Sequence, residues 1–177
     1  VGASMGGIIA QAFIHEYPDR VKKLGLVCTG VAAGCPEYVQ MTPENFKKIA
    51  FMGSTKEEKI KTIMELFFYP DYIKNHPEVK ETYLNSKIEA QSEYAFKLQL
   101  QACMDNRPYF DWLKDIKVPV IVMHGRQDIV WQLANAEVLK RGIGEACEFY
   151  VMENAGHMFF FEKEDEFNKR LHEFLKK

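Results

Sequence analysis

With 177 residues, of which 47% are hydrophobic, the chain is long enough to bury a sizeable core as one domain. Its net charge of −2 gives no basic excess that would indicate nucleic-acid binding, and no apolar run is long enough to span a membrane. The four cysteines, none of them in a C-x-x-C pair, indicate neither a zinc site nor a redox motif. Scattered thiols, together with the lack of signal-peptide features near residue 1, favour a cytoplasmic protein.

Residues 1–7 contain the stretch G-x-S-x-G, with Ser4 at its centre. This spacing is typical of a sharp turn between a strand and a helix that exposes a serine hydroxyl. We expect Gly2 and Gly6 to supply space, because side chains two positions before and after the serine would collide in such a turn. The N–H of Met5, at the start of the helix, is then in place to bind an oxyanion. A glycine-rich helix start with Ser4 as its N-cap is the alternative.

Beyond this turn, the pattern predicts a helix from Met5 to Tyr17, where apolar residues recur at helical spacing. A continuous apolar run from Leu24 to Thr29 predicts a strand buried on both faces, and a loop is expected to follow it. Strands alternating with helices imply a parallel sheet, here of three strands. The other strands and helices of this α/β pattern are expected at 118–124, 132–141, 148–152 and 163–176, and the last helix should turn Phe167, Leu171, Phe174 and Leu175 inward.

The middle of the chain, residues 37–112, is amphipathic and rich in Phe, Tyr and Met. Thr42 followed by Pro43 is a good helix start, with a capping residue and Pro at the first helical position. A second start lies at 54–57, and a further helical stretch begins at Pro77. No strand-like alternation appears, so we predict an inserted set of helices, about four in number. Packing between these helices explains the aromatic content; the wall of an acyl pocket is the alternative.

Three loops that follow the predicted strands carry Ser4, Asp128 and His157. In a parallel sheet such loops share one edge, where sites form. A serine hydrolase needs these groups: the serine attacks a carbonyl, the histidine takes and returns its proton, and the aspartate orients the imidazole. Asp128 could instead be an ordinary turn residue, and His157 an ordinary loop histidine. His124, inside a strand, is expected to be structural.

The chain resembles the C-terminal portion of an α/β-hydrolase. The segments G-A-S-M-G-G, V-P-V-I-V-M-H-G-R-Q-D and N-A-G-H-M-F-F-F-E match the family pattern in order and spacing. Within this family the chain most resembles the small cap-bearing members, namely enol-lactone hydrolases, carbon–carbon bond hydrolases, esterases and cofactor-free haloperoxidases. The resemblance implies a hydrolase core over 1–36 and 113–177 and a helical cap over 37–112. Val130 and Met158 are candidate substrate-binding residues, and neither a cofactor nor a metal is expected.

Two functions from different classes follow from this resemblance. The first is a serine hydrolase that cleaves an ester, lactone or related carbonyl compound through an acyl-enzyme on Ser4. A complete family member, however, has further strands and a second oxyanion amide before the serine turn, and these are expected to be missing here. The alternative is therefore a truncated, non-catalytic chain that acts as an interaction module or as half of a split enzyme. An unpaired edge of the Leu24–Thr29 strand would then bind a second copy or a separate N-terminal fragment.

Overall fold

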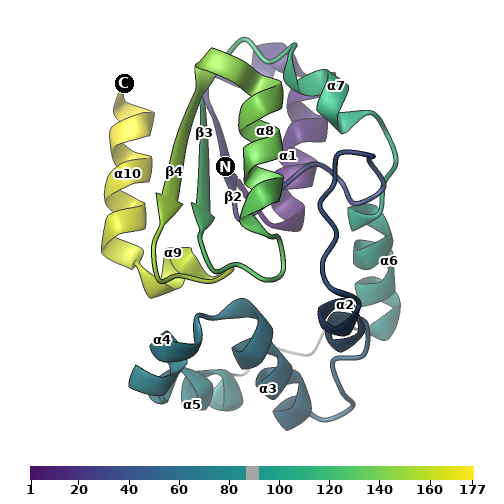
Figure 1. Ribbon diagram of the computed structural model, residues 1–177, viewed down its shortest axis with the longest axis vertical. Helices are drawn as coiled ribbons and strands as arrows, with labels where there is room; N and C mark the ends of the chain where they lie inside the picture. Colours follow the sequence, from purple (N-terminus) through teal and green to yellow (C-terminus); the bar gives the residue numbers. More distant parts are fainter. Residues whose placement is uncertain (87–91) are drawn as a thin grey trace.

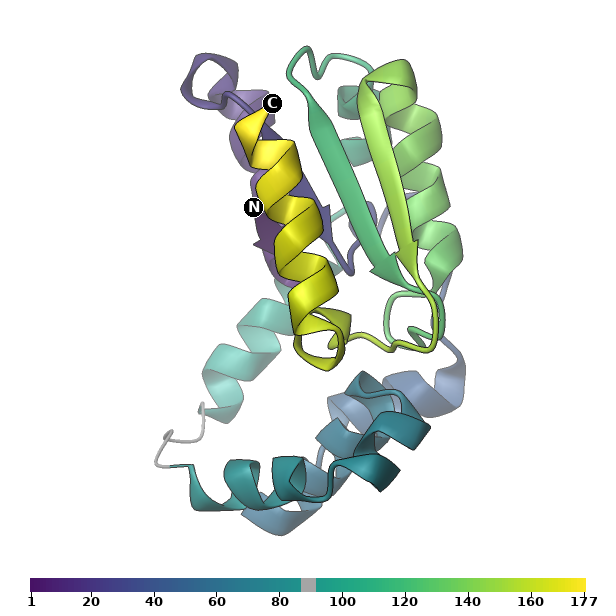
Figure 2. The same cartoon turned by 90° about the vertical axis from the view of Figure 1, so that its left-hand side faces the viewer.

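The computed structural model describes residues 1–86 and 92–177. In these residues a parallel sheet has the strand order β1 (Gly2–Ala3), β2 (Leu24–Val27), β3 (Val120–Gly125) and β4 (Cys147–Met152). One face is covered by α1 (Met5–Glu16), α7 (Tyr109–Leu113) and α8 (Leu133–Ile143), and the other by α9 (Phe159–Glu162) and α10 (Glu164–Lys176) (Figures 1 and 2). Among the described residues, no helix combines the length and apolar character needed to cross a lipid bilayer.

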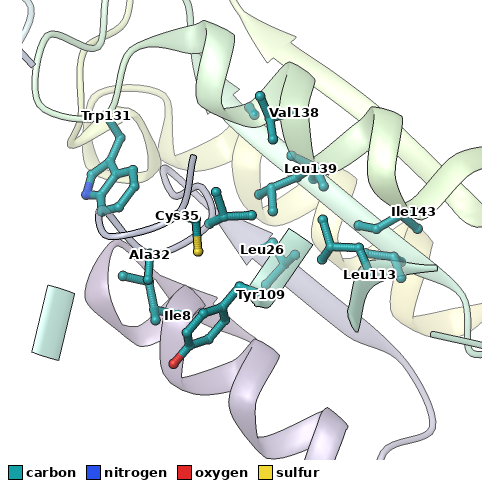
Figure 3. Packing of buried hydrophobic residues seen from close by; sticks show 14 of the residues in the cluster. Ile8, Leu26, Ala32, Cys35, Tyr109, Leu113, Trp131, Val138, Leu139 and Ile143 are labelled. Atoms are coloured by element: carbon teal, nitrogen blue, oxygen red, sulfur yellow. The ribbon is translucent and has the colours of Figure 1, made fainter. Parts of the chain in front are cut away.

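The two central strands are buried on both faces, as the apolar runs predict. On one face Leu26 and Val122 join the main core cluster, which packs against α1, α7 and α8 (Figure 3). On the other face Val27 and Met123 pack in a second cluster with residues of α9 and α10. The expected α/β architecture with a parallel sheet is thereby confirmed.

The sheet differs from the prediction at its outer edge. It has four strands in the described residues rather than three, because Gly2–Ala3 pairs with β2. The strand predicted over Leu24–Thr29 ends at Val27, since Cys28 has a φ of 41° and leaves the extended region. The prediction that this strand has an unpaired outer edge is therefore wrong for Leu26 and Val27, which pair with β1, and holds for Leu24 and Gly25. The outer edge of the sheet is formed by β1 and by this first half of β2.

In its described residues the middle block is helical, and these residues form one helix more than expected. The extra helix, α4, begins at Pro70, where the fixed φ of proline suits the first helical position. The predicted Thr42 cap and the helix start predicted at 54–57 are confirmed, since Thr42 and Thr55 accept hydrogen bonds from the first turns of their helices. Residues 87–91, within the helical stretch predicted from Pro77, lie outside the described residues. The helices are α2 (Pro43–Ala50), α3 (Lys56–Phe67), α4 (Pro70–Asn75), α5 (Glu78–Asn85) and α6 (Glu93–Cys103).

Figure 1 shows α3, α4 and α5 beyond the C-terminal ends of the strands, where a cap would lie. The boundary predicted at residue 112 falls inside α7, whose Tyr109 and Leu113 belong to the main core cluster. The division into core and cap stays a prediction. In α10, Phe174 is buried as expected, but Leu175 is 48% exposed, because it faces outward on the turn that buries its neighbour.

The serine turn depends on two close approaches of the main chain, only one of which was predicted. A Cβ atom on Gly2 would lie 2.1 Å from the carbonyl oxygen of Gly6, so this position requires glycine. A Cβ on Gly6 would meet nothing within 4 Å, so the predicted collision there is wrong. The second close approach is at Gly7, where a Cβ would lie 2.3 Å from the side chain of Thr29.

These contacts predict opposite effects for two neighbouring substitutions. Gly7→Ala should lower the free energy of unfolding by about 1–3 kcal/mol, as overpacking does, because Thr29 is buried and its hydroxyl is already hydrogen-bonded. Gly6→Ala has open space and a helical backbone, so it should be neutral or stabilising by up to about 1 kcal/mol. Urea unfolding followed by circular dichroism measures both, and equal losses for the two variants would contradict this account of the turn.

Candidate active site

Ser4 lies in the turn between β1 and α1 in a strained main-chain conformation, with φ 53° and ψ −124°. Two contacts with the end of β2 hold it there. The Ser4 N–H donates to the carbonyl of Val27 at 2.9 Å, and the Ser4 carbonyl accepts from the Thr29 hydroxyl at 2.7 Å. The Ser4 side chain makes no capping hydrogen bond to α1, which argues against the N-cap interpretation.

Met5 begins α1, so its N–H points out of the helix start and has no partner within the helix. None of the hydrogen bonds formed within residues 1–86 and 92–177 uses this N–H. The Met5 amide is therefore available to an anionic oxygen beside Ser4.

Asp128 and His157 form a hydrogen-bonded pair. The distance from His157 Nδ1 to Asp128 Oδ2 is 2.7 Å, and the two residues are 2% and 4% exposed. Asp128 follows β3 and His157 follows β4, so the parallel arrangement of these strands brings their exit loops together. The contact expected between the acid and the imidazole is present.

The Asp128 carboxylate is hydrogen-bonded on both oxygens. Oδ1 accepts the main-chain N–H groups of Val130 and Trp131 at 2.8 and 2.9 Å. Oδ2 accepts from His157 and also lies 3.3 Å from Nε2 of His124. His124 Nε2 is 2.6 Å from the Trp131 carbonyl, which can only accept, so this nitrogen carries a proton. Asp128 therefore organises its own turn, as a turn residue would, and binds His157 as well.

These donors decide the charge of Asp128. Burial opposes ionisation, but the neighbouring His157 and His124 outweigh it and lower the pKa of Asp128 to about 2. The group is thus an anion at neutral pH. His124, assigned only a structural role from the sequence, contributes to this. Its position directly before the G-x-x-D turn was the available signal.

The structure does not join all three predicted residues directly. In its described part, the Ser4 hydroxyl has no hydrogen bond to His157. Ser4 follows β1, Asp128 follows β3 and His157 follows β4, and these strands run parallel in one sheet. Ser4 therefore lies at the same edge of the sheet as the Asp128–His157 pair. Burial raises the pKa of the Cys28 thiol, and the charge of Asp128 raises it further.

The two candidate substrate-binding residues differ in their surroundings. Met158 packs against the helical block, and its N–H donates to the carbonyl of Phe67 at 2.8 Å. Val130 is buried in the main core cluster, and its N–H is used by Asp128. Their role in binding stays a prediction. Within the described ranges, no group of three or more His, Cys, Asp and Glu side chains is arranged to hold a metal ion.

Sequence reasoning assigned no role to two residues beside His157. The Phe67 ring meets the His157 ring edge-on, with centroids 5.2 Å apart. Glu162 is only 8% exposed, and its carboxylate accepts a hydrogen bond from the N–H of Gly156. Burial raises the pKa of Glu162, whereas its hydrogen bonds from main-chain N–H groups lower it. A lone acidic residue at the end of the apolar run 158–161 was the signal for this buried position.

A family model described as the alpha/beta hydrolase fold matches residues 1–164. The chain belongs to this family. It is 31% identical to a 2-hydroxy-6-oxononadienedioate/2-hydroxy-6-oxononatrienedioate hydrolase of Paraburkholderia phymatum, covering 99% of this chain and 61% of that protein. It is 29% identical to a monoacylglycerol lipase of Homo sapiens, covering 99% and 53%. The resemblance deduced from the sequence motifs is confirmed.

Solved structures agree on the fold. The meta-cleavage product hydrolase of Pseudomonas fluorescens superposes with a TM-score of 0.80 at 19% identity, over 99% of this chain and 63% of that one. This chain thus spans about three fifths of the length of the first curated relatives that it matches, 61% and 62%.

The depressed pKa of Asp128 predicts how stability depends on pH. The folded-state pKa of about 2 lies below the ordinary value of 3.8, so ionised Asp128 stabilises the fold above pH 4, and this contribution is lost as the pH falls from about 4 to about 2. Asp128→Asn removes the charge, and its amide N–H would face the His157 and His124 donors. The free energy of unfolding of wild type should therefore exceed that of Asp128→Asn by about 2 kcal/mol at neutral pH. This difference should shrink towards pH 2. Urea unfolding at several pH values measures this difference; a constant difference would contradict the prediction.

Proposed function

We propose that the chain carries the nucleophile, acid and base of a serine hydrolase that cleaves an ester, a lactone or a related carbonyl compound. The observation that carries this proposal is the buried Asp128–His157 pair, located on the same edge of the sheet as the strained Ser4. Ionised Asp128 accepts from Nδ1, which leaves Nε2 of His157 to exchange a proton with Ser4.

The proposed reaction has two halves. Ser4 attacks the substrate carbonyl as His157 takes the hydroxyl proton, and the Met5 N–H donates to the oxygen that becomes negative. His157 then protonates the leaving group, and an acyl-enzyme remains on Ser4. In the second half, His157 takes a proton from the water that attacks this ester and then gives it to the Ser4 oxygen as that bond breaks, and the acid product leaves. Asp128 stabilises the imidazolium formed in each half.

The substrate class is supported by the relatives, which are named as hydrolases of an oxo-dicarboxylic acid and of monoacylglycerols. We further propose that Met158, at the contact with the helical block, touches the substrate. Val130 would contribute to substrate binding through its N–H, which donates to Asp128. The mechanism requires no cofactor or metal. A cytoplasmic location would keep the four free cysteines reduced.

Labelling with a fluorophosphonate probe tests the mechanism, since only an activated serine reacts rapidly. Wild type should be labelled at Ser4, Ser4→Ala should not be labelled, and His157→Gln should be labelled roughly 10²–10⁴ times more slowly because the general base is lost. Ser92→Ala, which changes a helix cap of α6, is the matched control and should behave as wild type.

A non-catalytic role is the second candidate, and one surface feature favours it. A groove of about 720 Å³ runs beside β1, with mostly apolar lining that includes Leu24 of β2 and with Arg20, Lys22 and Lys23 also among the lining residues. Its apolar walls are unusually exposed for large hydrophobic side chains, namely Val1 at 67%, Ile9 at 56%, Phe13 at 44% and Leu175 at 48%. We propose that this edge binds a second copy of the chain or a separate N-terminal fragment. Equal labelling of wild type and Ser4→Ala would favour this role over catalysis.

This surface predicts self-association. At low micromolar concentration, light scattering should report a mass above 20.5 kDa for wild type, because burying the groove removes apolar area from water. Ile9→Glu places a charge in the groove and should shift the chain towards the monomer. Glu16→Gln, on the exposed end of the same helix and outside the groove, is the control. A wild-type chain that is monomeric with a cooperative melt would contradict the prediction.

A further inference from the structure

Glu162 joins two segments that are far apart in the sequence. It ends the short helix α9, which Figure 1 shows between the ends of β3 and β4 and the helix α4. Its Oε1 accepts the main-chain N–H of Tyr69 at 2.9 Å, and its Oε2 accepts that of Gly156, also at 2.9 Å. Tyr69 lies between α3 and α4, and Gly156 directly precedes His157. The carboxylate thus connects the helical block to the loop that carries the histidine.

The same two segments touch at three further points. We call residues 67–69 the cap strap. Its Phe67 carbonyl accepts the N–H of Met158 at 2.8 Å, on the far side of His157 from Gly156. A Cβ on Gly156 would lie 2.8 Å from the nitrogen of Tyr69, so the two main chains are in contact. The ring of Phe67 lies edge-on against the ring of His157. The cap strap therefore flanks His157 from the residue before it to the residue after it.

We propose that Glu162 is a positioning residue, which fixes the His157 loop to the cap strap and thereby holds the imidazole against Phe67, where it serves Ser4. This inference rests on the proposed role of His157 as general base. Asp128 holds the ring only at Nδ1, and a single hydrogen bond leaves the ring free to tilt about that point. The contact with Phe67 supplies the second constraint, and Glu162 keeps Phe67 in place.

The chemistry of the site requires a carboxylate rather than an amide. Both partners of Glu162 are N–H donors, and a carboxylate offers an acceptor oxygen to each of them. In Glu162→Gln one oxygen becomes an NH₂ group, which faces an N–H and cannot accept its hydrogen. The Gly156 donor is buried and the Tyr69 donor is partly buried, so this variant must lose one of the two connections.

The effect of Glu162 on the position of His157 can be measured without an activity assay. In NMR spectra, Glu162→Gln should shift the ring C–H signals of His157, because the ring current of Phe67 no longer acts at the same distance. Hydrogen exchange of the Tyr69 or Gly156 amide should become faster, while amides within β3 and β4 keep their protection. Glu164→Gln, an exposed neighbour in the first turn of α10, is the matched control and should match wild type in both measurements.

A second pair of variants removes the donor instead of the acceptor. Tyr69 has φ −67°, which proline adopts without backbone strain. Tyr69→Pro replaces the N–H hydrogen by a ring carbon that cannot donate to Glu162 Oε1, so it breaks this contact, whereas Tyr69→Ala keeps the N–H. Tyr69→Pro should reproduce the His157 shift of Glu162→Gln, and Tyr69→Ala should not. This pair keeps the proposal falsifiable if Glu162→Gln does not fold, which urea unfolding shows.

Fluorophosphonate labelling then tests the link to Ser4. Glu162→Gln and Phe67→Leu should each slow labelling at least about tenfold, and the double variant should be little slower than either one, because both act through one contact. Unchanged His157 signals in Glu162→Gln and Tyr69→Pro would overturn the proposal, since a merely structural role lowers stability without moving His157. Fully additive losses of labelling rate in the double variant would overturn it as well. Absence of labelling in wild type and Glu164→Gln would refute the hydrolase function instead, and the NMR measurements would then decide the positioning role alone.

Discussion

The arrangement of the candidate site depends on the need to satisfy one buried carboxylate. Asp128 is removed from water, where an unpaired charge would be costly, so every lone pair needs a donor. Two of its donors are main-chain N–H groups of its own loop, and two are imidazoles from β3 and from the loop after β4. Folding the loops around this charge places His157 at the sheet edge. The same interaction thus shapes the turn after β3 and selects the ring nitrogen that stays free.

A second constraint is the close approach of main chains around the histidine loop. A Cβ on Gly125 would lie 2.2 Å from the carbonyl oxygen of Gly156, and Gly156 in turn contacts the cap strap. Three segments, the end of β3, the loop after β4 and the cap strap, therefore pack at main-chain distance, where only glycine fits. Such packing leaves the histidine loop little freedom of its own. Its position is set jointly by the core and by the helical block.

The sequence was informative where chemistry restricts the residue types at short spacing. The serine turn, the G-x-x-D turn and the G-H pair each identify a strand end, so Ser4, Asp128 and His157 could be placed at one edge of a parallel sheet. The sequence was less informative where a segment far along the chain determines the local structure. Two residues became β1 only because β2 is beside them, and the end of β2 at Cys28 follows from a left-handed residue that no local pattern requires. Glu162 and Phe67 matter through contacts between the helical block and the core, which spacing along the chain cannot reveal.

The conformation of Ser4 has a consequence for the order of folding. The strained turn is held by Val27 and by Thr29, the latter 25 residues further along the chain. A peptide containing only the first turn and α1 lacks these partners, so it has no means of offsetting the cost of a positive φ at serine. The turn can form only after β2 has docked beside it, and docking of distant segments is slower than local helix formation. The strained conformation of Ser4 is therefore a late product of folding, and a chain caught before that step lacks the turn that would present this residue as a nucleophile.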